Sequence, residues 1–243
     1  MFQASKQKKS SVKRLVYRTL RSIYRKLKPK LVRRIEIEYE AESSMHVGER
    51  HFEYPFAIKS IVNLGKDRIQ STLDVGCTGS VFPIILASMG FHVTGTDINK
   101  WQIRYDNFEM VVDDIKRSKF EDESFDLITA ISTIEHCGLP RYGEEEVPNG
   151  DKLAVKEIYR ILRKGGYFII TVPFGRSMIY RDEYRIYSMG TFMDLVEDFQ
   201  VIEQEFYGPI HMDTIYEKCN EEDSYRIGTS KGIYCIMCAL LKK

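Results

Sequence analysis

Residues Ser71 to Val81 read STLDVGCTGSV, and this stretch decides the fold. An apolar run ends at Asp74, a turn with two glycines follows, and apolar residues then resume. This pattern is typical of a buried strand that passes into a helix through a loop close to a ligand. Gly76 and Gly79 lack the Cβ atoms that would block such an approach. We therefore expect a nucleotide-type binding turn here.

The rest of the chain adds strands and helices in alternation to this first turn. Alternating strands and helices predict parallel βαβ units, and hence an α/β fold with a doubly wound sheet. Helices are expected at Val81–Met89, Lys152–Leu162 and Thr191–Glu197. Strands are expected at Thr72–Val75, His92–Thr96, Met110–Val112, Phe125–Ser132, Tyr167–Val172 (after a tight turn at Gly165-Gly166), Phe199–Phe206 and Gly232–Leu241.

Size and composition indicate one domain in a reducing compartment. The chain has 243 residues, 43% of them hydrophobic, which is enough for a single core. Its five cysteines are an odd number at irregular spacing, so a cytoplasmic protein without a disulfide framework is expected. No apolar run is long enough to span a membrane, and the N-terminus lacks the features of a secretory signal.

The N-terminal arm has a different charge from the body. Residues 1–34 hold thirteen Lys or Arg and no acid, whereas residues 35–243, the expected main domain, hold 23 basic and 35 acidic residues. Val12–Lys28 repeats apolar residues at helical spacing, with Lys and Arg on the other face. This basic helix could pack on the body, become ordered only with a partner, or lie on an anionic membrane. Nucleic acid is not an expected partner, because no nucleic-acid module follows.

The segment Arg50–Asn63 is expected to form a turn at Pro55 followed by a helix. Tyr54 and Phe56 could close over a ligand of the first turn, or they could pack in the core.

An acidic residue follows the glycine turn at a sequence spacing that is typical of nucleotide-binding folds. Asp97 lies 21 residues after Gly76, the spacing at which dinucleotide and nucleoside folds place the carboxylate that accepts the ribose hydroxyls. The alternative for Asp97 is a helix N-cap, since Ile98-Asn99-Lys100 follows. The turn lacks the G-x-G-x-x-G of nicotinamide folds, and Asp74 would repel a pyrophosphate. It suits a ligand with an ammonium group and a ribose.

Together these motifs resemble the class I S-adenosylmethionine-dependent methyltransferases. Leu73–Ser80 matches part of their first motif, D-x-G-x-G-x-G, although Thr78 and Ser80 stand where the family usually has glycines. Further matches are Asp97, Asp114-Ile115, the spacing from Asp114 to Asp126, and the segment Ile158–Val172, IYRILRKGGYFIITV. The resemblance implies a Rossmann-like, mostly parallel seven-stranded sheet with an antiparallel C-terminal strand.

A narrower likeness lies in the loop from Glu135 to Gly143, EHCGLPRYG. It is similar to a loop of methyltransferase-like proteins found with polysaccharide and surface-glycan biosynthesis enzymes. It implies an acceptor such as a glycan or a lipid-linked sugar.

The resemblance assigns S-adenosylmethionine as the cofactor and places its ligands at the ends of the strands. The first turn would hold the methionine part, Asp97 with Ile98 the ribose, and Asp114 with Ile115 the adenine. The methyl side would be lined by the residues after the fourth strand. The cofactor-binding candidates are therefore Asp74, Gly76, Cys77, Gly79, Asp97, Ile98, Asp114, Ile115, Ser132 and Thr133.

Methyl transfer to a hydroxyl needs alignment and a base. His136 is the candidate base, with a loop histidine that caps backbone groups as the alternative. Glu135 would orient it or act in its place. Arg141, Tyr142 and Arg185 are candidates for binding the acceptor. No metal site is expected, because Cys235 and Cys238 would face opposite sides of a strand as buried thiols.

The sequence thus predicts a cytoplasmic methyltransferase, placed at a membrane surface if the basic helix binds there. Two alternatives stay open. The first is a binding or scaffold protein that keeps the fold without catalysis, for which Thr78 and Ser80 are the evidence. The second is an NAD(P)-dependent oxidoreductase, which Asp74 and the missing glycine disfavour.

Overall fold

In the part of the chain that the computed structural model describes, the main sheet has eight strands in the order β3-β2-β1-β4-β5-β10-β8-β9. A separate hairpin pairs β6 with β7. The strands are β1 Thr72–Val75, β2 Val93–Asp97, β3 Phe108–Val112, β4 Phe125–Ile131, β5 Leu162–Phe174, β6 Met178–Tyr180, β7 Tyr184–Ile186, β8 Gln200–Pro209, β9 Tyr216–Cys219 and β10 Cys235–Lys242.

The structure describes residues 48–140, 145–209, 216–226 and 234–243. The basic helix Val12–Lys28 and the expected domain boundary after Arg34 lie outside these residues, so both stay predictions. Within the described ranges, no helix has the length and apolar character needed to cross a membrane.

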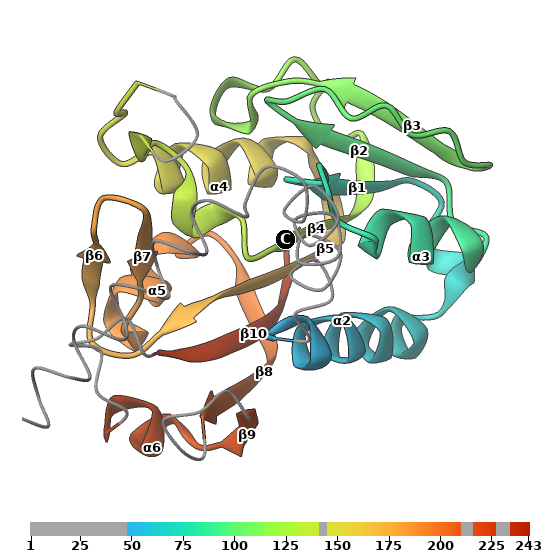
Figure 1. Ribbon diagram of the computed structural model, residues 1–243. Helices are drawn as coiled ribbons and strands as arrows, with labels where there is room; N and C mark the ends of the chain where they lie inside the picture. The colour runs from blue at the N-terminus through green and yellow to red at the C-terminus, as the bar shows by residue number, and fades with distance from the viewer. Residues whose placement is uncertain (1–47, 141–144, 210–215, 227–233) are drawn as a thin grey trace, which may run out of the picture. The chain divides into compact units, whose positions relative to one another are not determined.

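Helices cover both faces of the sheet (Figure 1). One face packs against α2 and α3, whose buried side chains include Phe56 and Phe82. The other face packs against α4 and α5, through residues such as Ile158 and Phe192. The helices are α2 Arg50–Leu64, α3 Phe82–Ser88, α4 Gly150–Ile161, α5 Met189–Leu195 and α6 Glu221–Arg226, with short 3₁₀ turns η1 Lys66–Arg68, η2 Ile115–Arg117 and η3 Ile134–His136.

The predicted doubly wound, mostly parallel sheet is confirmed. Strands β3, β2, β1, β4 and β5 pair in parallel, and β10 inserts antiparallel between β5 and β8. The described sheet has eight strands rather than the expected seven, because the sequence did not predict the edge strand β9; it did not predict the hairpin β6–β7 either. Both are short, and an edge strand needs little of the apolar alternation that identifies a central one.

Strand β10 buries both of its cysteines. Cys235 and Met237 face one hydrophobic core, while Ile236 and Cys238 face the other. This confirms the expectation that the two thiols are buried on opposite sides of a strand, since side chains alternate across a sheet.

Two local predictions are wrong. Helix α2 begins at Arg50 and continues through Pro55, rather than starting after a turn at that residue. Pro55 lies early in the helix, where only one backbone donor is lost and tertiary packing compensates for it. The Gly165-Gly166 pair does not separate a helix from a strand, because β5 already starts at Leu162. It forms an irregularity, across which the partner of β4 jumps from Leu162 to Tyr167.

Replacing Gly150 by alanine should destabilise the fold by about 1–3 kcal/mol. Gly150 begins α4, and a Cβ there would lie 2.6 Å from the Cα of Gly138 and 2.7 Å from the carbonyl oxygen of Cys137. Gly190, in α5, is the matched control, because a Cβ there has only Ser188 Oγ nearby, at 3.9 Å. Urea unfolding should show Gly190→Ala to be neutral or stabilising by about 0.4–1 kcal/mol. Equal effects of the two substitutions would contradict the close approach at Gly150.

Candidate functional site

The glycine turn after β1 packs against the loop after β4. Gly76 has φ +74°, and a Cβ there would lie within 2.4 to 3.0 Å of three atoms of the Thr133 side chain. The Thr133 hydroxyl donates to the carbonyl oxygen of Val75 or Ile131, both at 3.1 Å. Gly79 also has a positive φ, of +76°, but the space where its Cβ would point is open. Gly76 therefore permits contact within the protein, and Gly79 leaves room for a ligand.

Asp97, at the end of β2, binds the same turn. One of its carboxylate oxygens accepts from the backbone N–H of Thr78 at 3.1 Å, and the other from that of Asn99 at 2.8 Å. The helix N-cap that the alternative interpretation expected is not formed, because no helix follows Asp97: the bond to Asn99 closes a local bend, and the bond to Thr78 ties two strand ends together. Each carboxylate oxygen has a further lone pair, so Asp97 can still accept from a ligand.

The side chains of Thr78 and Ser80 make local hydrogen bonds around the turn. The Thr78 hydroxyl donates to the carbonyl oxygen of Asn99 at 3.1 Å. Ser80 Oγ accepts from the N–H of Phe82 at 3.2 Å, at the start of α3, and lies 3.2 Å from the hydroxyl of Tyr54. These two departures from the family's glycines therefore brace the turn.

Asp74 is buried beneath the turn, with only 2% of its surface exposed. It accepts a hydrogen bond from Thr129 Oγ1, on the neighbouring strand β4. Burial raises its pKa to about 7, against the opposing effects of the Thr129 bond and the Arg50 charge. Near neutral pH, Asp74 is therefore divided between its acid and carboxylate forms.

The remaining cofactor-binding candidates differ in how far their side chains are accessible to a ligand. The Cys77 side chain is fully buried, with its sulfur 3.3 Å from that of Met110, so only its backbone faces the turn. Ile115 is buried in the core as well, whereas Ile98 is 36% exposed. Asp114 caps η2 by accepting from the N–H of Lys116 at 3.1 Å.

The loop after β4 carries the candidate catalytic residues. His136 Nδ1 lies 2.7 Å from the carbonyl oxygen of Glu183, in the hairpin β6–β7. A carbonyl can only accept, so in the neutral ring Nδ1 carries the proton and Nε2 is the basic nitrogen. Glu135 is 2% exposed, and its Oε1 lies 3.7 Å from His136 Nε2.

Burial, and then the neighbouring acids Glu53 and Glu49, raise the pKa of Glu135 well above its ordinary value. Its Oε2 is buried and has no hydrogen-bond partner within the described residues. Low dielectric surroundings favour the neutral acid. Burial therefore disfavours the charged form of Glu135, and the roles of His136 and Glu135 in catalysis stay predictions.

Arg185 reaches the loop from β7 but binds protein groups. Its Nη1 donates to the carbonyl oxygen of Cys137 at 2.8 Å, and its Nε lies 3.4 Å from a carboxylate oxygen of Asp151. The guanidinium thus holds the loop in place, and a direct contact with an acceptor stays a prediction. Arg141 and Tyr142 lie outside the described residues.

Helix α2 supplies site residues that sequence reasoning missed. Glu53 is fully buried and accepts from Thr171 Oγ1 at 2.6 Å and from the hydroxyl of Ser132. Arg50 forms an ion pair with Glu53, and its guanidinium lies over the ring of Tyr54. No local pattern marks Glu53 as a site residue, because the two hydroxyl groups that it binds lie 79 and 118 residues away in the chain.

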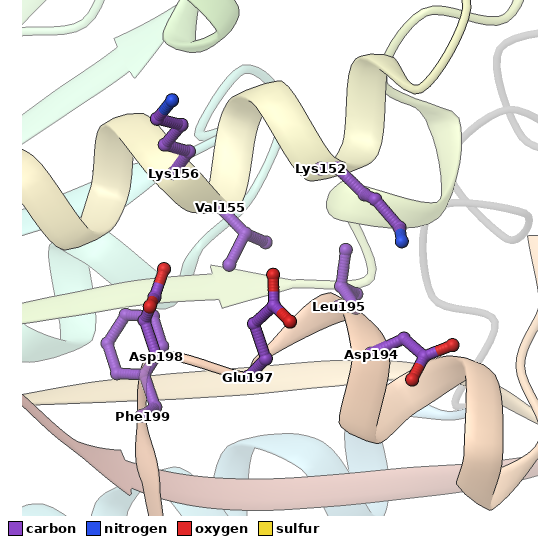
Figure 2. Close-up of a pocket in the computed structure, with 8 residues that line it drawn as sticks. All are labelled: Lys152, Val155, Lys156, Asp194, Leu195, Glu197, Asp198 and Phe199. Atoms are coloured by element: carbon purple, nitrogen blue, oxygen red, sulfur yellow. The ribbon is translucent and has the colours of Figure 1, made fainter.

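A separate groove lies between α4 on one side and the end of α5 with the segment that follows it on the other (Figure 2). Lys152 and Lys156 stand on α4, opposite the carboxylates of Asp194, Glu197 and Asp198. None of the candidate site residues lines it, and its charged side chains are exposed. It therefore plays no part in the site at the strand ends.

The residues at the strand ends fit S-adenosylmethionine better than a metal ion. Open space above Gly79, and spare lone pairs on Asp97, suit a ligand that presents hydroxyl donors. Within the part of the chain that the structure describes, no three His, Cys, Asp or Glu side chains are grouped so as to hold a metal ion.

Comparison with known proteins points to the same class. Residues 73–170 match the profile of a family described as "Methyltransferase domain". The chain is 31% identical over 109 residues to the sterol 4-C-methyltransferase strm-1 of Caenorhabditis elegans. That alignment covers 40% of this chain and 29% of the relative, so the chain spans under a third of that protein.

Solved structures share the fold at low sequence identity. An S-adenosylmethionine-dependent methyltransferase from Methanosarcina mazei superposes with a TM-score of 0.53 at 16% identity, over 75% of this chain and 96% of its own. A 1,6-didemethyltoxoflavin-N1-methyltransferase from Burkholderia thailandensis, with S-adenosylhomocysteine bound, gives 0.55 at 14% identity, over 86% and 84%. The fold is therefore the Rossmann-like fold of these methyltransferases.

Replacing Asp74 by asparagine should change how stability depends on pH. Between about pH 4 and 7, the unfolded chain has lost a proton that folded Asp74 retains, so wild-type stability falls as the pH rises to about 7. Over this pH range Asp74 should lower the free energy of unfolding by on the order of 4 kcal/mol. Urea unfolding at pH 4, 5.5 and 8 should show this fall in the wild type, relative to Asp74→Asn.

Asp126 is the control, because its pKa is shifted in the opposite direction from that of Asp74. Although burial raises its pKa, hydrogen bonds from Arg163 and from the backbone of Gln70 and Ser71 lower it overall. The stability that it contributes is present above its unfolded pKa and is lost as the pH falls through its folded pKa. The difference between wild type and Asp126→Asn should therefore shrink on acidification. A pH-independent difference between wild type and Asp74→Asn would contradict the assignment for Asp74.

Proposed function

We propose that this protein transfers a methyl group from S-adenosylmethionine to a hydroxyl, in a glycan or a lipid-linked sugar. One observation carries the proposal: the segment that matches the methyltransferase profile brings the glycine turn, Asp97 and the His136 loop to the same end of the sheet. In open α/β sheets, ligands bind at the carboxyl ends of the strands.

The cofactor would be held at the ends of β1, β2 and β3. The backbone of the turn from Gly76 to Gly79 would contact the methionine part, Asp97 the ribose hydroxyls, and Asp114 the adenine. When bound, the cofactor supplies an electrophilic methyl group on a sulfonium. The protein therefore has to align the acceptor and remove its proton.

His136 would remove that proton at Nε2. Its Nδ1–H donates to the carbonyl oxygen of Glu183, which sets the tautomer and orients the ring. The Tyr184 ring stands edge-on to the imidazole, with the ring centroids 6.3 Å apart. Glu135 would assist as a neighbouring acid rather than as the base, because its burial favours the neutral form.

The nature of the acceptor is supported by the loop that begins at Glu135 and by the aromatic side chains of the hairpin. Tyr180 packs against Tyr184 with ring centroids 5.3 Å apart, and Tyr184 in turn contacts Tyr234. Such amphipathic rings suit a ligand with an apolar face and hydroxyl groups. A role for Val12–Lys28 at an anionic membrane, where lipid-linked precursors would lie, belongs to the same proposal.

The scaffold alternative loses its evidence at the turn. It depended on Thr78 and Ser80, whose side chains brace the turn through local hydrogen bonds. The oxidoreductase alternative predicts binding of NAD rather than of S-adenosylhomocysteine, and the following experiment distinguishes the two.

Calorimetry should show that the protein binds S-adenosylhomocysteine and does not bind NAD. Asp97→Ala should weaken binding about 10- to 100-fold, because hydrogen bonds to a charged group contribute about 1.5–3 kcal/mol. Asp67→Ala is the control: Asp67 is an exposed acid in η1, at the other end of the sheet. Binding of NAD alone would overturn the proposal, and binding of neither ligand would support the scaffold.

Replacing His136 by alanine should lower kcat about 10²- to 10⁴-fold and leave cofactor affinity unchanged, as expected for loss of a general base. Transfer of a radiolabelled methyl group to a panel of sugars and lipid-linked sugars provides the measurement. His92→Ala is the control, because His92 is exposed just before the opposite end of β2. Undiminished turnover in His136→Ala would remove this residue from the mechanism.

A further inference from the structure

We infer that Glu53 is a positioning residue for methyl transfer: from helix α2, it fixes the backbone from which the His136 loop departs. The inference deepens the proposed function and rests on it for the catalytic consequence. Glu53 lies outside the segment 73–170 that matches the methyltransferase profile. Its contacts give it this role.

The Glu53 carboxylate is satisfied on both sides within the protein. Its Oε1 accepts from Ser132 Oγ and from Thr171 Oγ1, the latter at 2.6 Å. Its Oε2 accepts from the guanidinium of Arg50, one turn earlier in α2. A fully buried carboxylate is expensive unless it is paired and hydrogen-bonded, and these three donors meet that condition. The carboxylate thereby joins α2 to the ends of β4 and β5.

Ser132 needs such a restraint. It is the first residue after β4, and its φ of +46° lies in the left-handed region that side chains other than glycine rarely adopt. Its hydroxyl donates to Glu53, and its N–H donates to Thr171 Oγ1 at 2.9 Å. Thr171 donates in turn to Glu53, which closes a hydrogen-bonded ring of three residues that includes the strained Ser132. Strain of this kind persists only where the surroundings enforce it.

The conformation of Ser132 sets the direction of the loop that follows. Thr133 packs against Gly76, and the N–H of His136 donates to the carbonyl oxygen of Thr133 at 3.1 Å. The path from Ser132 to His136 is thus one short hydrogen-bonded turn. Hairpin β6–β7 holds the far side of the His136 ring through Glu183. Without Glu53, the loop would keep its restraints at Thr133 and His136 and lose the one that holds the Ser132 hydroxyl.

Hydrogen exchange tests the restraint without depending on activity. In the full chain, Glu53→Gln should accelerate exchange about tenfold in peptides that contain Ser132 and His136, while exchange in the core strands stays unchanged. Glutamine keeps the size of the side chain but loses the charge that pairs with Arg50. Thr171→Val removes the hydroxyl that bonds to both Glu53 and Ser132, and it should accelerate exchange in the same peptides. This variant replaces Glu53→Gln in the test if Glu53→Gln does not fold.

Lys59→Ala is the matched control on the same helix. Lys59 anchors α2 to β8 through Glu203 and Glu205, at 2.8 and 2.7 Å. It should leave exchange in the His136 loop, and kcat, unchanged. If it accelerates exchange there as much as Glu53→Gln does, the effect is one of helix docking and the inference is overturned.

A double-mutant cycle with Ser132→Gly provides the kinetic test. Glycine adopts a positive φ without strain, so the restraint supplied by Glu53 should matter less in its presence. Glu53→Gln should lower kcat about tenfold in the wild type, with little change in cofactor KM, and less in the Ser132→Gly background. Additive effects, or an unchanged kcat in Glu53→Gln, would overturn the inference.

The two assays separate the failure of this inference from that of the proposed function. Absence of methyl transfer in the wild type would defeat the function, and the exchange data would still decide whether Glu53 restrains the loop. Unchanged exchange in both Glu53→Gln and Thr171→Val would defeat the inference, whatever the activity.

Discussion

The contact between Thr133 and the Cα of Gly76 is the one on which the site depends. Through this contact the loop after β4 packs directly against the turn after β1, so the expected catalytic loop and the expected cofactor turn are neighbours. A side chain at position 76 would collide with Thr133 at 2.4 Å and would also be strained at a φ of +74°. The glycine is therefore needed for assembly of the site, before any ligand approaches.

Depth in the protein separates the roles of the acidic residues. Asp97 lies at a strand end, where its carboxylate accepts from two backbone N–H groups and keeps lone pairs for a ligand. Asp74 and Glu135 are buried, and burial raises the pKa of each. Glu53 is also buried, but an arginine and two hydroxyls satisfy its carboxylate. Chemically similar side chains thus stand in three environments: a partly exposed strand end for Asp97, burial with a raised pKa for Asp74 and Glu135, and burial among an arginine and two hydroxyl donors for Glu53.

Sequence periodicity predicted the central strands and the doubly wound order, because buried parallel strands are continuous apolar runs. It did not predict the edge strand β9 or the hairpin β6–β7, whose short segments carry little of that signal. Among the candidate site residues, Asp97 was identified by its spacing from Gly76. Arg185 was predicted to bind the methyl acceptor. In the structure its guanidinium donates to the carbonyl oxygens of Glu135 and Cys137 in the loop after β4.

The sequence by itself determined the class of fold, from the alternation of strands and helices, and it determined the turn at Gly76 and the acid at Asp97, which lie 21 residues apart. Each of these signals is a pattern that can be read along the chain. Only the tertiary structure decided that Thr78 and Ser80 brace the turn, and that Glu53 reaches Ser132 and Thr171. The physical reason is that hydrogen bonds of buried polar groups are satisfied across the fold, between residues as much as 118 positions apart. No local pattern encodes such partners; the packing of α2 on the sheet selects them.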